Sequence, residues 1–249
     1  MLAKLATVIL LWSALWAGQA HAEEDKMTTL ITGANRGIGL ELARQLQAQG
    51  HAVIGTARKP DEAAELKALG ARVLQLDVTD AASVQAMAAA LRGQPIDLLI
   101  NNAGIGGHTA PSFEETDFDQ IGLTFDVNSI GPMRVTQALL PNVLASQRKL
   151  VVSISSIMGS IANNQGGYYG YRASKTALNM LNSSLALELA DRGVTAVVLH
   201  PGWVKTRMGG PSAAITTEDS VQGLLQVITG LQPTDSGRFI DYQGNELPW

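Results

Sequence analysis

The stretch TTLITGANRGIG, residues 28–39, carries the clearest indication of the fold. A short β-type run leads straight into three glycines, Gly33, Gly37 and Gly39, and a helical pattern follows them. Glycines let the backbone approach a pyrophosphate without a Cβ in the way, and the start of a helix offers free N–H groups and a positive dipole end. This order of strand, glycine loop and helix favours a dinucleotide site, although a purely structural turn would also use glycines.

The rest of the chain repeats the pattern of a short apolar run followed by a helical stretch. Most runs are continuous Val, Ile and Leu, as in strands that are buried on both faces. We expect strands at residues 28–32, 52–57, 72–77, 98–101, 150–155 and 195–200, with a short one near Phe239. We expect helices at 38–49, 63–69, 81–91, 118–128, 132–146, 172–191 and 220–230. The pattern predicts an α/β fold over residues 26–249, a single Rossmann-type, doubly wound parallel sheet of about seven strands with helices on both faces.

Composition narrows the functional classes. The chain has 249 residues, of which 46% are apolar and 16% charged, enough for one sizeable core. A net charge of −4 without any run of Lys or Arg argues against a nucleic-acid partner. The absence of cysteine excludes disulfides and thiolate metal sites, and the four histidines lack ligand spacing, so no metal is expected.

The first 22 residues have the features of a secretory signal peptide. Lys4 precedes an apolar run at residues 5–17, and Ala20-His21-Ala22 supplies the small residues of a cleavage site. The run is shorter than the ~20 apolar residues that a membrane span needs. The alternative is a translation start at Met27. The protein is then either exported, to the periplasm or the medium, or cytoplasmic.

The end of the second predicted strand bears on the cofactor. NAD sites of this fold usually place a carboxylate there to bind the ribose 2′-OH. This chain has GTARK at residues 55–59, with no acid, and Arg58 offers a guanidinium that matches a 2′-phosphate. Arg36 of the glycine loop would cover the same phosphate from the other side. We therefore predict NADP(H) rather than NAD(H), the alternative being two solvated surface arginines.

Polar residues end the next two predicted strands. Asp77-Val78 follows the third strand, and Asn101-Asn102-Ala103-Gly104 follows the fourth, both at the sheet edge where ligands bind. Asp77 would bond the adenine amino group and Val78 would pack beside its ring. Asp77 would equally serve as the cap of the following helix.

A pair of serines and a tyrosine–lysine pair are the candidate catalytic residues. Ser155-Ser156 ends the fifth predicted strand, and Tyr171 and Lys175 are four residues apart, on one face of a helix. A free phenol titrates near pH 10, and we expect the nearby ammonium to lower the pKa of Tyr171 toward neutrality. The alternative is a surface aromatic with a lysine stacked beside it.

Five motifs in order, TGANRGIG, NNAG, SSxxG, YxxxK and HPG, resemble the short-chain dehydrogenase/reductase family across residues 27–249. The stretches YYGYRASKTALN (168–179) and PGWVKT (201–206), with the ending DYQGNELPW (241–249), look like its sniffer and C-factor-like carbonyl reductase branch.

The resemblance implies a catalytic tetrad. Asn128 would help to hold a water against Lys175. Ser156, rather than Ser155, would hydrogen-bond the substrate carbonyl. Tyr171 would protonate the forming alkoxide, and Lys175 would also bind the nicotinamide ribose. The predicted cofactor contacts are Gly33, Asn35, Arg36, Gly37, Ile38, Gly39, Arg58, Asp77, Val78, Asn101, Ala103, Gly104, Tyr171, Lys175, Pro201, Gly202, Val204 and Thr206.

Two functions follow from this pattern. The first is a reductase of a small-molecule aldehyde or ketone, with pocket walls from residues 106–113, 158–169 and 203–215. The long gap between Ser156 and Tyr171 would form a loop at that pocket. The second is a C-factor-like signalling protein that binds nucleotide with little turnover. Monomer and homodimer both stay open, since such proteins often associate through the two long helices, here 132–146 and 172–191.

Overall fold

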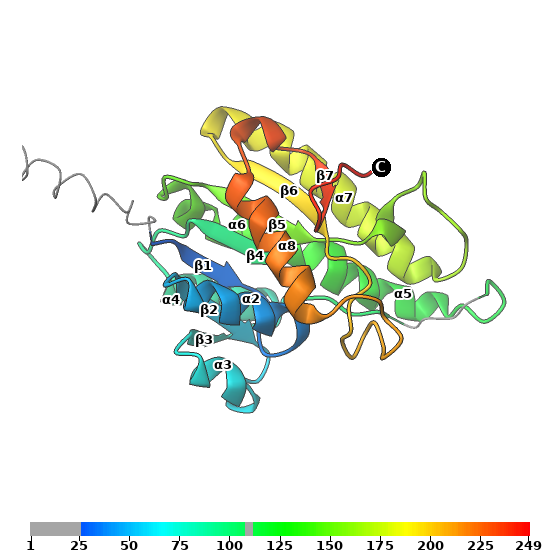
Figure 1. The fold of residues 1–249 in the computed structure, drawn as a ribbon, viewed down its shortest axis with the longest axis horizontal. Coiled ribbons are helices and arrows are strands. Elements are labelled where there is room, and N and C mark those ends of the chain that lie inside the picture. Colours follow the sequence, from blue (N-terminus) through cyan, green and yellow to red (C-terminus); the bar gives the residue numbers. More distant parts are fainter. Residues whose placement is uncertain (1–25, 108–111) are drawn as a thin grey trace, which may run out of the picture.

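The computed structural model describes residues 26–107 and 112–249 (Figure 1). The predicted signal peptide, residues 1–22, lies outside the described residues, as does part of one predicted pocket wall, 108–111. Within the described ranges, no helix combines the length and the apolar character that crossing a membrane would require.

The predicted α/β fold is confirmed. Seven parallel strands form one sheet in the order β3-β2-β1-β4-β5-β6-β7. The order reverses between β1 and β4, which opens a crevice at the carboxyl ends of these strands. The strands are β1 Thr28–Ile31, β2 Ala52–Ala57, β3 Arg72–Gln75, β4 Leu98–Asn101, β5 Leu150–Ile154, β6 Thr195–His200 and β7 Phe239–Asp241.

Helices cover both faces of the sheet. One core lies under α2 (Gly37–Ala48), α3 (Ala64–Ala68) and α8 (Thr217–Gly230), and α2 and α8 cross in front of the sheet in Figure 1. The other core lies under α4 (Ala81–Ala90), α6 (Gly131–Leu144) and α7 (Tyr169–Leu189).

Successive residues of a strand serve the two cores alternately. Leu98 and Ile100 of β4 belong to the α2/α8 core, whereas Leu99 between them belongs to the α4/α6 core. Side chains alternate across a strand, so a central strand with a helix layer on each side must be apolar throughout. This accounts for the continuous apolar runs in the sequence.

The predicted break between two helices near residue 130 is wrong. A π-helical turn, η2 (Asp126–Ile130), joins α5 (Phe118–Phe125) directly to α6. Pro132 follows as the second residue of α6. It has no N–H to donate to the preceding turn, where the helical hydrogen bonding is already irregular. Single π turns inside α-helices occur frequently at functional sites, and this one carries Asn128.

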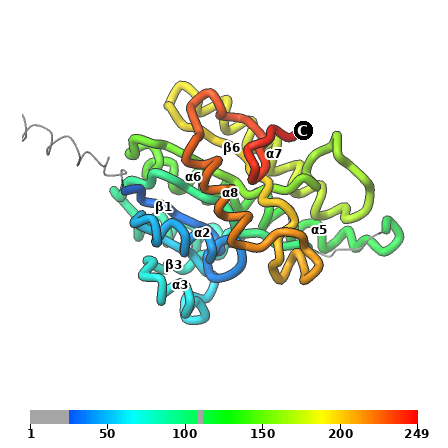
Figure 2. The backbone as a smooth tube through the Cα atoms, viewed as in Figure 1, coloured from blue at the N-terminus to red at the C-terminus, as the bar shows by residue number. Residues whose placement is uncertain are grey.

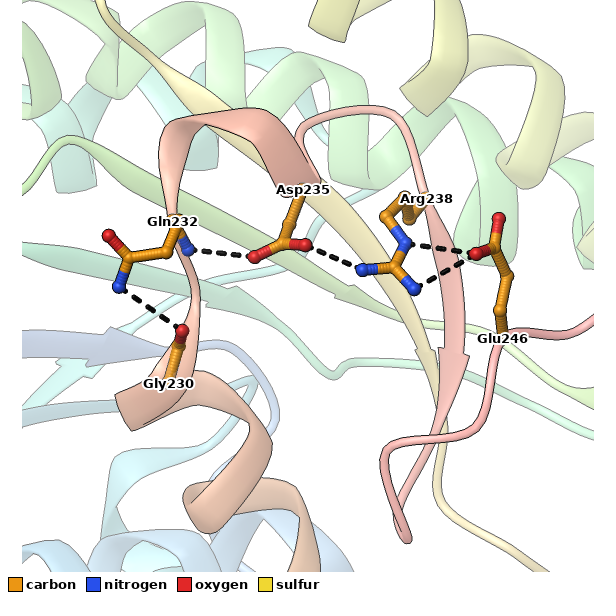
Figure 3. Close-up of polar contacts among 5 residues, drawn as sticks. All are labelled: Gly230, Gln232, Asp235, Arg238 and Glu246. Atoms are coloured by element: carbon orange, nitrogen blue, oxygen red, sulfur yellow. Dashed lines mark hydrogen bonds and ion pairs between the residues drawn. The ribbon is translucent and has the colours of Figure 1, made fainter.

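Polar contacts hold the C-terminal segment against the edge strand β7 (Figure 3). The Arg238 guanidinium contacts Asp235 Oδ1 at 2.6 Å and Glu246 Oε2 at 2.9 Å, and Asp235 Oδ2 accepts from the backbone N–H of Gln232. Farther along, the Trp249 ring stacks on Phe239 with centroids 5.5 Å apart. The described chain therefore ends packed on the sheet.

Candidate active site

The glycine loop between β1 and α2 is built for close approach. Gly33 and Gly37 have φ values of +64° and +57°, which favour glycine. A Cβ on Gly39 would lie 2.5 Å from both the Asn102 side-chain nitrogen and the Gly33 carbonyl oxygen. No side chain caps the start of α2, so its first N–H groups remain available to an anion. A cradle that a Cβ would fill, at a free helix start, fits the pyrophosphate of a dinucleotide.

Asn102, which the sequence analysis did not select, holds this loop. Its Nδ2 donates to the carbonyl oxygens of Thr32 (2.9 Å) and Gly33 (3.1 Å), and Thr32 Oγ1 accepts from the backbone N–H of Asn102. The side chain of Asn101 points the other way, because neighbouring residues of a strand face opposite sides. It is buried and donates to Thr136 Oγ1 of α6 at 2.9 Å. Only the backbone of Asn101 lies at the predicted site.

Three arginines gather beside the loop. The pKa of Arg36 is lowered by partial burial, then by the positive charges of Arg207 and of Arg58. All three residues are exposed. The sequence analysis predicted Arg36 and Arg58 as neighbours but missed Arg207, which comes from the segment after β6. A concentration of positive charge at this edge suits phosphate groups.

The pKa of Asp77, at the end of β3, is lowered by hydrogen bonds from Thr79, then by the charge of Arg58. Asp77 Oδ1 accepts from the Thr79 N–H at 3.0 Å and from the Thr79 hydroxyl at 2.7 Å. The alternative that Asp77 caps the next helix is wrong, because Asp80 caps α4 by accepting from the Ala82 N–H. Val78 is buried, and a Cβ on Gly131 at the start of α6 would lie 2.8 Å from its Cγ2.

The two serines after β5 have different roles. The Ser155 hydroxyl is buried and donates to Asn179 Oδ1 of α7 at 2.6 Å. Ser156 caps the short turn η3 (Ile157–Gly159), since its Oγ accepts from the Met158 N–H at 3.1 Å, and it also forms a hydrogen bond with Tyr171. The preference for Ser156 over Ser155 therefore agrees with the geometry.

Tyr171 and Lys175 lie on one face of α7, with Lys175 Nζ 5.9 Å from the centre of the Tyr171 ring. Lys175 is buried, and its Nζ donates to the Ile154 carbonyl oxygen at 2.8 Å. Burial lowers the pKa of Lys175 to about 8. Burial raises the pKa of Tyr171, against the hydrogen bond from Ser156 that lowers it.

Our expectation that Lys175 brings the pKa of Tyr171 toward neutrality is thus wrong for this structure. The physical reason is the removal of the phenol from water, which disfavours its charged form and outweighs the neighbouring groups. At neutral pH the Tyr171 phenol stays protonated. It is therefore placed to donate a proton rather than to accept one.

The π turn brings Asn128 into the same site. Its Oδ1 accepts from the Ile105 N–H at 2.9 Å, and its Nδ2 donates to the Ile105 carbonyl at 2.9 Å and to Ser174 Oγ at 3.1 Å. A Cβ on Gly104 would lie 3.3 Å from Asn128 Oδ1 and 3.8 Å from Lys175 Nζ. The backbone after β4 therefore runs past both side chains, and Asn128 fixes its path.

The segment after β6 closes the site on its other side. Gly202 has a φ of +83°, and a Cβ there would collide with Ile215. Thr206 packs against the glycine loop, because a Cβ on Gly37 would lie 3.6 Å from its Cγ2. Pro201 and Val204 of this segment are buried, and their contact with the cofactor stays a prediction. Figure 2 shows this segment, in orange, beside the blue glycine loop.

The long loop before Tyr171 only partly matches its expected role. It starts at Ser156 and then wraps round the start of α7 to line a pocket of about 490 Å³. The α7 residues of that pocket include Arg172, Thr176 and Met180, which point away from the face of Lys175. The segment 158–169, which was predicted to line the substrate pocket, therefore lines mainly this other pocket, on a different face of α7 from Lys175.

Comparison with known proteins gives a consistent result. The family model described as short chain dehydrogenase matches residues 27–215. The C-signal protein of Myxococcus xanthus is 49% identical over 156 residues, which is 62% of this chain and 93% of that protein. The NADPH-bound carbonyl reductase from chicken fatty liver aligns with a TM-score of 0.84 at 34% identity, covering 90% of this chain and 99% of its own. The Sniffer carbonyl reductase of D. melanogaster aligns with a TM-score of 0.84 at 31% identity, covering 90% and 100%.

Proposed function

Because the chain belongs to the short-chain dehydrogenase family, we propose that it is an NADP(H)-dependent oxidoreductase that reduces the carbonyl group of an aldehyde or a ketone to an alcohol. One observation carries this proposal. The phenol of Tyr171 is buried with a hydrogen bond to Ser156 and with Lys175 Nζ 5.9 Å from its ring, so a protonated hydroxyl stands among polar groups at the site. Reduction of a carbonyl needs such a donor beside the oxygen that becomes an alkoxide.

The proposed cofactor follows from the crevice at the β1/β4 reversal. The glycine loop would hold the pyrophosphate on the free N–H groups of α2. Arg36 and Arg58 would bind the 2′-phosphate that distinguishes NADP(H) from NAD(H). The solved chicken carbonyl reductase is an NADPH complex, which supports the same assignment.

The reacting groups would come from the segment that follows β5 and from the first two turns of α7. Reduced nicotinamide, when bound, supplies the hydride. The Ser156 hydroxyl would hydrogen-bond the substrate oxygen, and the Tyr171 phenol would give that oxygen its proton. Lys175 would bind the ribose and, while protonated, stabilise the phenolate that proton transfer leaves on Tyr171. Asn128 holds the Ile105 backbone beside them.

A second function, intercellular signalling with little turnover, is favoured by one specific observation. The C-signal protein of Myxococcus xanthus is 49% identical to this chain over its aligned part. The predicted signal peptide agrees with such a role, since an exported protein meets little reduced NADP. Against it stand the proposed reacting groups, Asn128, Ser156, Tyr171 and Lys175, because nucleotide binding alone does not require all four.

Turnover separates the two functions. The purified protein would be screened against a panel of aldehydes and ketones, with oxidation of NADPH and of NADH followed by absorbance. We expect reduction of at least one carbonyl class with NADPH, and slower reduction with NADH. Tight NADPH binding without turnover on a broad panel would favour signalling instead.

A further inference from the structure

Arg207 occupies a position that the proposed chemistry does not yet use. It follows Thr206, whose methyl group packs 3.6 Å from where a Cβ of Gly37 would stand. Arg36 immediately precedes Gly37. The two arginines are therefore the chain neighbours of the two residues, Thr206 and Gly37, that join the segment after β6 to the glycine loop.

The backbone that carries Arg207 is a closed turn. Gly210 N–H donates to the Thr206 carbonyl at 2.9 Å and Gly209 N–H donates to Thr206 Oγ1 at 3.0 Å. The Trp203 indole N–H reaches the Gly209 carbonyl at 2.9 Å, and Lys205 N–H donates to the Ile215 carbonyl at 2.8 Å. Arg207 is thus carried by a hydrogen-bonded turn that packs on the glycine loop, where its charge acts on Arg36.

This contact brings the like charges of Arg36 and Arg207 near each other, while Arg58 acts both on Arg36 and on the carboxylate of Asp77. None of the ion pairs that the structure describes at residues 26–107 and 112–249 includes Arg36, Arg58 or Arg207. Arg36 lies within the influence of both other charges. Arg36 is therefore repelled by two exposed guanidiniums, and an anion bound among them would relieve that repulsion.

We propose that Arg207 is a third arginine of the 2′-phosphate site, reaching it from the segment after β6 while Arg36 and Arg58 reach it from the β1 and β2 ends. The inference rests on the proposed use of NADP(H). A phosphate monoester carries nearly two negative charges at neutral pH, and its three terminal oxygens offer acceptors for several guanidinium donors. NADPH would then gain, through its 2′-phosphate, a contact with the Arg207 turn that NADH lacks.

Nucleotide fragments isolate this contact. The binding of adenosine 2′,5′-bisphosphate and of adenosine 5′-monophosphate to the whole protein would be measured by calorimetry. We expect Arg207→Ala to weaken the bisphosphate roughly five- to thirtyfold, as for an exposed charge-assisted hydrogen bond, and to change the monophosphate less than about twofold. Arg207→Lys should fall between, because it keeps the charge and loses the fork.

Lys205→Ala is the matched control, since it removes an exposed cation from the same turn. It should leave both fragments within about twofold of the parent protein. The double variant Arg36→Ala/Arg207→Ala should lose less than the product of the single losses, because both residues would contact one phosphate.

Three results would overturn the inference. Parental binding by Arg207→Ala would remove Arg207 from the site. Equal losses for both fragments would assign it to the 5′-phosphate. A loss equal to that of Lys205→Ala would reduce its role to net charge. A parent protein that does not prefer the bisphosphate would instead defeat the proposed NADP(H) preference, and this inference with it, before any variant is compared.

Discussion

The ammonium nitrogen of Lys175 lies 5.9 Å from the centre of the Tyr171 ring and donates its hydrogen bond to the Ile154 carbonyl rather than to the phenol. Burial acts on the two groups in opposite directions, raising the pKa of Tyr171 and lowering that of Lys175 to about 8. At neutral pH both hold their protons, the phenol fully and the lysine mostly. In this state the Tyr171 phenol can donate a proton.

The depressed pKa of Lys175 predicts a specific dependence of stability on pH. The folded value of about 8 lies below the ordinary 10.5, so the folded state binds the proton less tightly than the unfolded state. Burial of the charge therefore destabilises the protein by about 3 kcal/mol below pH 8, a penalty that declines as the pH rises toward 10.5. Between pH 7 and pH 9 we expect the parent protein to gain about 1 kcal/mol relative to Lys175→Met in urea unfolding. Equal changes in the free energy of unfolding of the two proteins between pH 7 and pH 9 would contradict a buried charge on Lys175.

His200 at the end of β6 predicts a change of the same sign in a lower pH range, with stability lost as the pH falls below 6.5. Burial lowers its pKa to about 4, against the charge of Asp241, and its Nδ1 has no hydrogen-bond partner. The group is neutral in both states above its ordinary pKa of 6.5, and the folded state alone resists protonation as the pH falls toward 4. At pH 5 the parent protein should have lost about 1–2 kcal/mol more stability than His200→Gln, relative to pH 7. Equal losses in thermal unfolding at the two pH values would argue against a buried neutral histidine.

The strands were the most predictable part of the fold. The bounds of β2, β4 and β6 agree with the predicted strands at 52–57, 98–101 and 195–200, because a strand between two helix layers is a short, largely apolar run. Helix starts were less predictable. The π turn at Asp126–Ile130 and the start of α7 at Tyr169 depend on packing between α5, η2 and α7, which no local pattern encodes.

The candidate site, like the fold, was only partly predictable from the sequence. The glycine loop and the Tyr171/Lys175 pair are local motifs that can be read directly from the sequence, and the family resemblance predicted that they belong to one site. Arg207 was missed because its nearness to Arg36 arises from two loops far apart in the chain. The direction of the Tyr171 pKa was missed because burial is a property of the folded protein, not of the spacing to Lys175.

Arg58 provides a second test of the predicted preference for NADPH over NADH. It stands at the end of β2, where a carboxylate would select NAD(H), and its charge acts on Arg36. Arg58→Ala or Arg58→Asp should weaken NADPH by about 1.5–3 kcal/mol and change NADH affinity little. Fluorescence titration with both cofactors measures this. Similar losses for the two would show that Arg58 does not read the 2′-phosphate.

The N-terminus predicts where the protein works. Lys4, the apolar run at 5–17 and Ala20-His21-Ala22 lead us to propose export, with a mature chain that begins at Glu23. N-terminal sequencing or intact mass of the protein from its native host measures this. A cytosolic chain that begins at Met1 or at Met27 would exclude the export proposal and remove one argument for signalling.

Replacement of Tyr171 by Phe distinguishes an enzyme from a nucleotide-binding protein. The change removes one hydroxyl, so α7, Lys175 and the glycine loop should keep their structure and NADPH affinity should change little. Turnover should fall by ~10²–10⁴-fold, the usual contribution of a positioned general acid.

Lys175→Met should lower both turnover and cofactor affinity, because Lys175 would bind the ribose as well as stabilise the phenolate. The losses in rate should not add in the double variant, since the two residues act as one unit. Steady-state kinetics with NADPH titrations of each variant measures both quantities. Full turnover by Tyr171→Phe would show that the proton comes from elsewhere and would overturn the mechanism proposed for this site.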